Sequence, residues 1–216
     1  MTPPPARPTL PPRRRPEGQK IDIAVLASGS GTNLQALIDT PSIRPHIALV
    51  VSDRAEARAL QRAAAAGLPT AVVAWPSDGD RVAFSAEVAD AVEDSGAKGV
   101  VLAGFMRILA PAFIDRFPAR VLNIHPSLLP AFPGSRAVES ALEHGVTVTG
   151  VTVHVVDEKV DHGPIISQVA VPVLPDDTPE TLHARIQVEE HRIYPEAVAA
   201  LVEGRIHVEG RRVVVE

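Results

Sequence analysis

The sequence predicts an α/β fold in which helices flank a mainly parallel sheet, with antiparallel strands in the C-terminal part. Short apolar runs rich in β-branched residues recur as far as residue 125, and stretches of helical length separate most of them. This alternation is typical of parallel strands with helices on both faces. The later part changes character, because two long apolar runs follow each other there.

The first strand is expected at residues 21–27, where IDIAVLA is short, apolar and β-branched, as in a buried strand. Similar runs predict further strands at 46–53, 70–75, 98–104 and 120–125. The intervening stretches predict helices at 29–39, 55–67 and 80–96. The second of these helices is rich in alanine and ends at a glycine.

In the C-terminal part, VTVTGVTVHVV (146–156) predicts a long strand and IISQVAVPV (165–173) an antiparallel partner. A long helix is expected from about Thr178 to Val202. The last residues predict a hairpin around Glu209-Gly210.

Composition and charge narrow the class of protein. The 216 residues are enough for one domain with a proper core, and no apolar run has the length of a membrane-spanning helix. The absence of cysteine excludes a thiol nucleophile, a disulfide framework and a cysteine-ligated metal. The net charge of −5 gives no general reason to expect a nucleic-acid partner.

The N-terminus differs from the rest of the chain. Residues 1–20 hold seven of the 21 prolines, and their four arginines, one lysine and one glutamate give +4, which leaves −9 on the remainder. Proline at this density prevents helices and sheet ladders. We therefore expect a disordered tail at 1–20 and one folded domain at 21–216.

Ligands of open parallel sheets bind beyond the carboxyl ends of the strands, so functional residues are expected there. The motif SGSGTN (28–33) follows the first strand and opens a helix, an arrangement that suits an anion such as a phosphate. It is not a dinucleotide fingerprint, because Leu34 stands where a third glycine is needed. The alternative is a tight turn with an ordinary helix cap.

The stretch VLNIHPSLLPAFPG (121–134) places two polar side chains at the end of an apolar strand. Asn123 and His125 alternate with Ile124 and so share one face, and Pro126 blocks continuation of the strand. They are candidates for catalysis. The alternative is a structural histidine that bonds to a nearby carbonyl.

The stretch HVVDEKVDHGP (154–164) brings an acidic loop after a strand that ends near His154. Loops held by a rigid sheet often carry catalytic carboxylates. The local sequence does not rank Asp157, Glu158 and Asp161, and a solvated acidic turn is the alternative. A metal site is not expected, because these residues have no standard zinc spacing.

A further carboxylate lies in the predicted long helix. Glu190 is four residues after Ile186 and three before Ile193, which places it on the apolar face. A buried carboxylate needs a partner, and the sequence leaves open whether this is an internal arginine or a ligand.

Five motifs, in this order, resemble those of the glycinamide ribonucleotide formyltransferases of purine biosynthesis: SGSGTNLQAL, VLAGFMRIL, NIHPSLLPAFPG, DEKVDHGP and EEHRIYP. The resemblance covers about residues 21–208 and implies the Rossmann-like formyltransferase fold, with 21–216 as the catalytic domain. The departures are mild: Ser30 stands where asparagine is common in the family, and the tail is extra.

The resemblance also implies roles for individual residues. It implies a catalytic set of Asn123, His125 and Asp161, with His154 in support. It implies that glycinamide ribonucleotide is bound by Gly31, Thr32, Asn33 and Glu190. It implies that the folate is bound by Arg81, Met106, Arg107, Ile108, Leu109, Asn123 and Asp157.

The activity that the resemblance implies is transfer of a formyl group from 10-formyltetrahydrofolate, a co-substrate, to the amine of glycinamide ribonucleotide. The amine attacks directly, the oxyanion is stabilised by preorganised donors, and neither a covalent enzyme intermediate nor a metal is needed. We expect a cytoplasmic monomer or homodimer with small-molecule substrates and no nucleic acid or membrane partner.

Three rival functions stay open. A formyl-folate hydrolase has a similar triad but is expected to carry a regulatory domain ahead of it. A methionyl-tRNA formyltransferase is expected to have a further RNA-binding domain and a basic surface. A non-enzymatic nucleotide-binding protein would explain SGSGTN but would give Asn123, His125 and Asp161 no shared purpose.

Overall fold

The computed structural model describes residues 20–216 of the protein. The tail expected at 1–20 therefore lies outside the described residues, apart from Lys20. That residues 21–216 form one catalytic domain stays a prediction.

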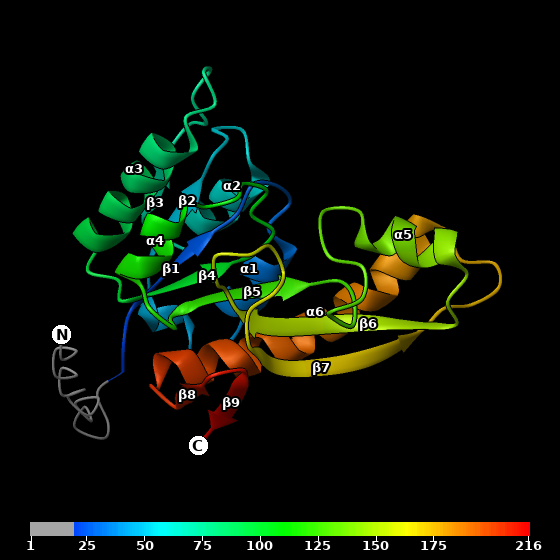
Figure 1. The fold of residues 1–216 in the computed structure, drawn as a ribbon. Helices are drawn as coiled ribbons and strands as arrows, with labels where there is room; N and C mark the ends of the chain where they lie inside the picture. Colours follow the sequence, from blue (N-terminus) through cyan, green and yellow to red (C-terminus); the bar gives the residue numbers. More distant parts are fainter. Residues whose placement is uncertain (1–19) are drawn as a thin grey trace, which may run out of the picture.

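Seven strands form one sheet in the order β3-β2-β1-β4-β5-β6-β7 (Figure 1). The first five are parallel, whereas β6 is antiparallel to both β5 and β7. The strands are β1 (Ile23–Leu26), β2 (Ile47–Ser52), β3 (Thr70–Val72), β4 (Gly99–Leu102), β5 (Val121–His125), β6 (Val148–Val155) and β7 (Ile165–Pro172). The predicted fold class is confirmed, including the antiparallel C-terminal part.

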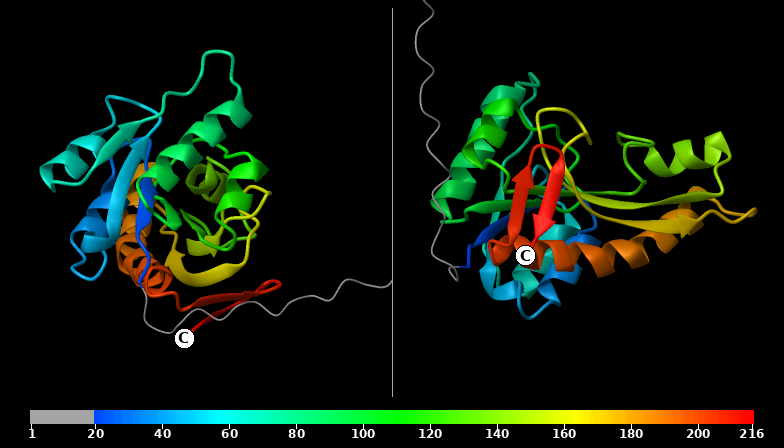
Figure 2. Two further views of the ribbon diagram at one scale, coloured as in Figure 1. Left: turned by 90° about the vertical axis from the view of Figure 1, so that its left-hand side faces the viewer. Right: turned by 60° about the horizontal axis from the view of Figure 1, so that its bottom comes forward.

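Helices cover both faces of the sheet, as Figure 2 shows. They are α1 (Thr32–Ile38), α2 (Arg58–Ala65), α3 (Arg81–Asp94), α4 (Pro111–Arg116), α5 (Ala137–His144) and α6 (Pro179–Val202), with a 3₁₀ turn at Arg44–His46. Alternate residues of β1 enter different cores: Ile23 and Val25 pack with α1, α2 and α6, whereas Ala24 and Leu26 pack with α3 and α4. This is why the strands are apolar on both faces.

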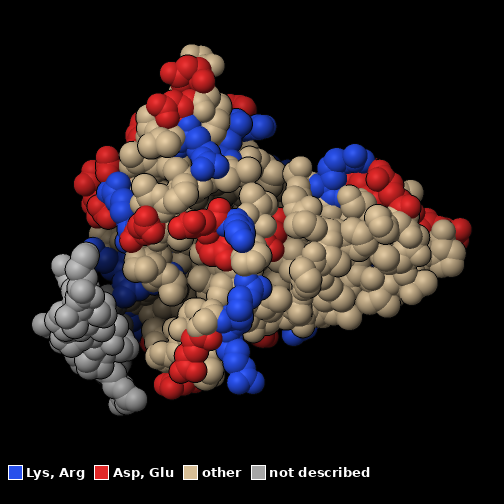
Figure 3. All heavy atoms as spheres, viewed as in Figure 1, with Lys and Arg blue, Asp and Glu red and all other residues tan. Residues whose placement is uncertain are grey.

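An arm extends away from the parallel strands (Figure 1). We use this name for β6, β7, α5 and residues 179–190 of α6. Acidic and basic side chains are spread over the parallel part, whereas the face of the arm seen in Figure 3 carries few charges away from α5.

Helix α6 joins the arm to the parallel part. Thr178 and Thr181 form a capping box at its start. The helix runs from Pro179 to Val202, which confirms the start and end predicted from the sequence. The hydroxyl of the fully buried Tyr194 donates to the carbonyl of Leu102 on β4, at 2.7 Å, and also faces the carbonyl of Leu122 on β5, at 3.2 Å. The helix is therefore fixed directly to the strands that lead into the site.

Some elements differ from expectation. The sequence analysis did not predict α4 and α5, which have only six and eight residues and lie among prolines and glycines. Strand β3 is three residues long and stops before the apolar residues 73–75. The terminal hairpin of β8 (Ile206–Glu209) and β9 (Arg212–Val215) is confirmed and forms a separate two-stranded sheet.

Between residues 20 and 216, the structure contains no helix that is both long and apolar enough to cross a bilayer.

Replacing Tyr194 with phenylalanine should lower the free energy of unfolding by about 1–3 kcal/mol, because two buried carbonyls lose their donor. Urea unfolding of the variant and the parent measures this difference. Glu196→Gln, at a position on the same helix whose side chain is 70% exposed, is the control and should stay within about 0.5 kcal/mol. Equal stability of Tyr194→Phe and the parent would contradict the anchoring role.

Candidate active site

The carboxyl ends of β1, β4 and β5 meet at one edge of the sheet. The loop after β1 is tied to the loop after β4, because the Ser28 N–H donates to the Gly104 carbonyl at 3.1 Å. The Ser28 hydroxyl in turn accepts from the Met106 N–H at 2.9 Å. The motifs at 28–33 and 104–109 therefore lie together, as the rule on strand ends predicts.

Strand β5 is the point at which the sheet changes from parallel to antiparallel. Asn123 lies opposite Leu102 on the parallel neighbour β4 and opposite His154 on the antiparallel neighbour β6. This register places the side chains of Asn123 and His154 next to each other. The Asn123 Nδ2 and the His154 Nε2 are 3.2 Å apart.

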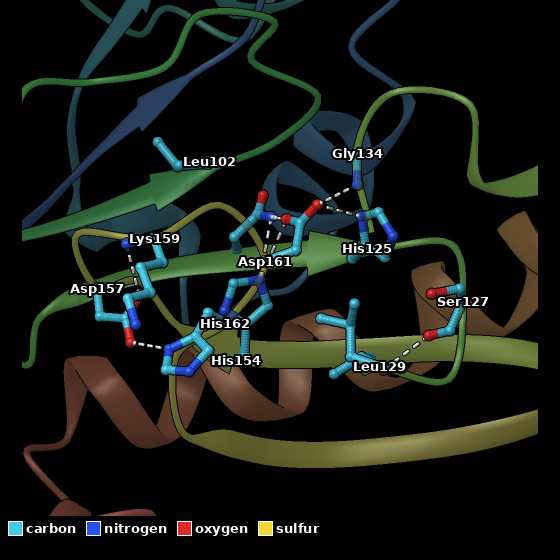
Figure 4. A network of polar contacts seen from close by, with 12 residues as sticks. Leu102, His125, Ser127, Leu129, Gly134, His154, Asp157, Lys159, Asp161 and His162 are labelled. Atoms are coloured by element: carbon cyan, nitrogen blue, oxygen red, sulfur yellow. Dashed lines mark hydrogen bonds and ion pairs between the residues drawn. The ribbon is translucent and has the colours of Figure 1, made fainter. Parts of the chain in front are cut away.

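The carboxylate of Asp161 reaches this strand end from the loop after β6 (Figure 4). Its Oδ2 accepts from the Gly134 N–H at 2.7 Å and lies 3.4 Å from the His125 Nδ1. Its Oδ1 lies 3.4 Å from the Asn123 Nδ2 and 3.8 Å from the His154 Nε2. The structure therefore brings together the three residues of the expected catalytic set and His154.

Both ring nitrogens of His154 have polar neighbours. Its Nδ1 lies 3.0 Å from the Val155 carbonyl, which can only accept, so we assign the proton to Nδ1. The Nε2 faces both the Asn123 amide, at 3.2 Å, and the Asp161 carboxylate, at 3.8 Å. With 1% of its surface exposed, His154 orients Asn123 from within the sheet.

His125 also has an acceptor at each ring nitrogen. Its Nδ1 faces Asp161, and its Nε2 lies 2.8 Å from the carbonyl of Phe132. Phe132 has a φ of 52°, a left-handed conformation that is uncommon outside glycine. The loop after β5 thus folds back over His125 and fixes the plane of its ring.

The environment keeps Asp161 ionised. Burial raises the pKa of this carboxyl, but the adjacent His154 ring, the Gly134 N–H and the His125 ring outweigh burial. The net effect is a pKa below the usual range of an aspartate. Asp161 is therefore a charged acceptor at neutral pH.

A cavity of about 780 Å³ opens next to these residues. Asn123, His125, His154 and Asp161 line one part of it. Six of the seven expected folate residues line it, namely Asn123 and also Met106, Arg107, Ile108, Leu109 and Asp157. Arg81 begins α3 and is not among the lining residues, so the structure does not bring it to this cavity.

The expected ribonucleotide residues gather separately, between α1 and α6. The Asn33 amide donates to the Glu190 carboxylate at 3.0 Å, and Glu190 is only 4% exposed. The partner of this buried carboxylate is thus an asparagine rather than an arginine. Gly31 has a φ of 69°, and a Cβ at this position would lie 2.7 Å from the Cα of Ala59. Glycine is therefore required at the turn that delivers Thr32 and Asn33.

Sequence reasoning missed Asp53, which follows β2 at the same edge of the sheet. Its fully buried carboxylate lies 2.7 Å from the Arg107 Nε, and the Arg107 guanidinium lies 4.7 Å from the centre of the Trp75 ring. Asp53 thus orients a residue of the cavity wall. The rule on strand ends would have found it, because it is the first residue after β2.

Within residues 20–216, no three histidine or acidic side chains are arranged to hold a metal ion. His162 points away from His154 and pairs with Asp157, at 2.7 Å from Nδ1 to Oδ2 (Figure 4).

Comparison with known proteins decides the family. The family model described as formyl transferase matches residues 21–198. The chain belongs to this family. This formyl transferase is 46% identical over 203 residues to a phosphoribosylglycinamide formyltransferase of Mycobacterium tuberculosis (strain CDC 1551 / Oshkosh), and the match covers 93% of this chain and 94% of the relative.

Solved structures agree with this assignment. Glycinamide ribonucleotide transformylase 1 from Symbiobacterium toebii superposes on the formyl transferase with a TM-score of 0.87 and 51% identity, covering 92% of this chain and 95% of the other. A formyltetrahydrofolate deformylase from Pseudomonas syringae pv. tomato has a TM-score of 0.82 at 30% identity and is covered over 66% of its length.

Some relatives are much longer than this formyl transferase. The trifunctional purine biosynthetic protein adenosine-3 of Bos taurus is 47% identical over 193 residues, which are 88% of this chain but 19% of the relative. The chain therefore spans about a fifth of the length of that protein.

The charge of Asp161 should make its contribution to stability dependent on pH. A carboxyl whose folded-state pKa is lowered stabilises the fold above its unfolded-state pKa, and this contribution is lost as pH falls through the folded-state value. The difference in unfolding free energy between the parent and Asp161→Asn should be constant near neutral pH and should shrink below about pH 4.

Urea unfolding between pH 3 and pH 7 measures this difference. Asp176→Asn, at an exposed position before α6, is the control and should show no such trend. A difference for Asp161→Asn that widens as pH falls would contradict the direction of the pKa shift.

Proposed function

We propose that the protein transfers the formyl group of 10-formyltetrahydrofolate to the primary amine of glycinamide ribonucleotide, giving N-formyl-glycinamide ribonucleotide and tetrahydrofolate, in de novo purine biosynthesis. The observation that carries the proposal is the convergence of Asn123, His125 and Asp161 at the wall of the cavity, where the polar atoms of Asn123 and His125 each lie 3.4 Å from the Asp161 carboxylate. The matches to named phosphoribosylglycinamide formyltransferases over most of both chains support the choice of substrate.

In this proposal, stabilisation of an oxyanion is the main task of the strand end. Attack of the amine on the formyl carbon gives a tetrahedral intermediate with negative charge on oxygen. The Asn123 NH₂ group and the His125 ring are the donors that the end of β5 would offer to this oxyanion. Their contacts with Asp161 are long, at 3.4 Å, so the developing oxyanion can compete for these donors.

Asp161 would serve the proton transfer. A proton must leave the attacking nitrogen, and the departing N10 of the folate must gain one. The charged carboxylate of Asp161 lies 3.4 Å from the His125 Nδ1 and lines the cavity, so it would accept the proton that leaves the substrate amine. All bond changes then occur between the two substrates, and no side chain forms a covalent bond.

The two substrates would occupy different parts of the site. The folate fits the cavity, where Met106, Ile108 and Leu109 supply apolar surface and Arg107 supplies a cation. The ribonucleotide would use the backbone N–H groups of the turn at Gly31 to Asn33 for its phosphate and Glu190 for a hydroxyl or amine. Arg81, exposed at the start of α3, would meet only the outer end of the folate.

The partners and location that we propose follow from this chemistry. Both substrates are small molecules, and the net charge of −5 gives no general reason to expect a nucleic-acid partner. We place the protein in the cytoplasm as a monomer or homodimer.

A hydrolase is the second candidate, because a formyltetrahydrofolate deformylase is also among the similar structures. It would pass the formyl group to water instead of to an amine. Helix α6 favours the transferase, because its Glu190 faces Asn33 of the glycine-rich turn and so builds a second binding region.

The folate product should appear only when both substrates are present. Absorbance of the deformylated folate, recorded with and without glycinamide ribonucleotide, measures this. Turnover without the ribonucleotide would support the hydrolase, and no turnover in either mixture would reject both enzymes.

Replacing His125 with alanine should lower kcat by at least 10²–10³-fold, roughly the effect of removing one oxyanion donor, while ribonucleotide binding measured by calorimetry is retained. His46→Ala is the matched control, because His46 lies just before the amino end of β2, away from the carboxyl ends of the strands that form the site. Normal turnover by His125→Ala would contradict the assignment of the active site.

Replacing Glu190 with glutamine should raise the KM for the ribonucleotide about tenfold and leave the KM for the folate unchanged, because a charged hydrogen-bonding group is lost from one substrate only. Glu189→Gln, one residue earlier on the more exposed side of α6, should behave like the parent. A larger change in the folate KM than in the ribonucleotide KM would indicate that Glu190 belongs to the folate region instead.

A further inference from the structure

The terminal hairpin lies against the loop that carries Asp161. Arg211, in the turn between β8 and β9, donates from Nη1 to the carbonyl of His162 at 2.5 Å. The same nitrogen lies 3.4 Å from the His162 Nδ1. The right-hand view of Figure 2 shows the hairpin reaching up to this loop. The two segments are about 50 residues apart in the sequence.

The His162 side of the loop is held by side chains. The His162 Nδ1 pairs with the Asp157 Oδ2 at 2.7 Å, and the Asp157 Oδ1 accepts from the Lys159 N–H at 2.9 Å. Burial raises the pKa of Asp157, but the His162 ring, the Lys159 N–H and the Arg211 charge outweigh it and lower the pKa overall. Asp157, His162 and Arg211 therefore form a polar cluster that links the two ends of the loop to the hairpin.

The far end of the loop is packed tightly on β6, whereas Asp161 has an uncommon backbone conformation. A Cβ on Gly163 would lie 1.7 Å from the Val155 carbonyl, and the Val155 N–H donates to the Pro164 carbonyl at 2.9 Å, so this end is packed tightly on β6. Asp161, two residues earlier, has a φ of 50°. A non-glycine residue keeps this conformation only when its surroundings enforce it.

Small movements of the loop would matter for chemistry. The contacts of Asp161 with His125 and Asn123 are both 3.4 Å long, close to the limit for a hydrogen bond. A displacement of about 1 Å would break both contacts, and displacements of this size can lower a rate about 100-fold.

We propose that Arg211 is a positioning residue for Asp161. By holding the His162 carbonyl, it keeps the adjacent Asp161 in its left-handed conformation and within reach of His125 and Asn123. The expected effect on turnover rests on the proposed function, whereas the hold of Arg211 on the loop does not.

Arg211 is suited to such a test because its contacts are exposed. Exposed hydrogen bonds and ion pairs typically contribute no more than about 1 kcal/mol to stability. The loss of Arg211 should therefore leave the protein folded, and an effect on turnover would come from the loop.

The test compares Arg211→Ala, Arg211→Lys and Arg212→Ala with the parent. Arg212 is the next residue, is exposed and begins β9, so its replacement controls for loss of a charge on the same hairpin. Arg211→Ala should lower kcat about tenfold or more with an unchanged KM for the ribonucleotide and the same Tm. Arg211→Lys, which retains a donor for the His162 carbonyl, should recover most of the rate.

Hydrogen exchange of the loop is a second measurement that needs no turnover. Peptides covering residues 157–163 should exchange faster in Arg211→Ala than in the parent and in Arg212→Ala. Unchanged exchange in this loop would overturn the proposal, even if the parent protein proved to have another activity. Equal kcat of Arg211→Ala and an active parent would overturn it as well, whereas an inactive parent would reject only the proposed function.

Discussion

The position of β5 between a parallel and an antiparallel neighbour is the constraint on which the site depends. On one side, β4 brings the carboxyl-end loops that line the cavity; on the other, β6 runs in the opposite direction and brings His154 beside Asn123. Strand β6 ends beside the amino end of β5, so the chain must fold back to reach the carboxyl end of β5. The loop to Pro164 makes this return, and it places Asp161 over the side chains that β5 presents.

Two short loops carry the unfavourable backbone geometry that this arrangement requires. Phe132 and Asp161 both have a positive φ, and both contact His125, one through a carbonyl and one through a carboxylate. Conformations of this kind persist when the surrounding structure enforces them, and they concentrate at functional sites. The rigid strand and the Tyr194 anchor beneath it provide the fixed frame against which these loops are held.

The sequence was informative where function depends on local geometry. Asn123 and His125 could be found because they share a face at a strand end, and Gly31 because it opens a helix after a strand. Asp161 could not be ranked above Asp157 and Glu158 from local sequence, because the choice depends on which carboxylate the returning loop directs inward. The place of Asp53 after β2 could have been read from the sequence, but the pairing of Asp53 with Arg107 and that of Arg211 with His162 join distant segments, which residue spacing does not record. Helices α4 and α5 are too short for their periodicity to stand out.

Helix α6 gives the arm and the parallel sheet a common core. Leu182 and Ile186 in its first half and Val198 in its second half belong to one apolar cluster that also contains Ile23 of β1 and Val153 of β6. Neither part can lose its packing without exposing the apolar face of the same helix to water. The domain should accordingly behave as a single cooperative unit, and its arm should tolerate exchange between relatives only together with the helix that supports it.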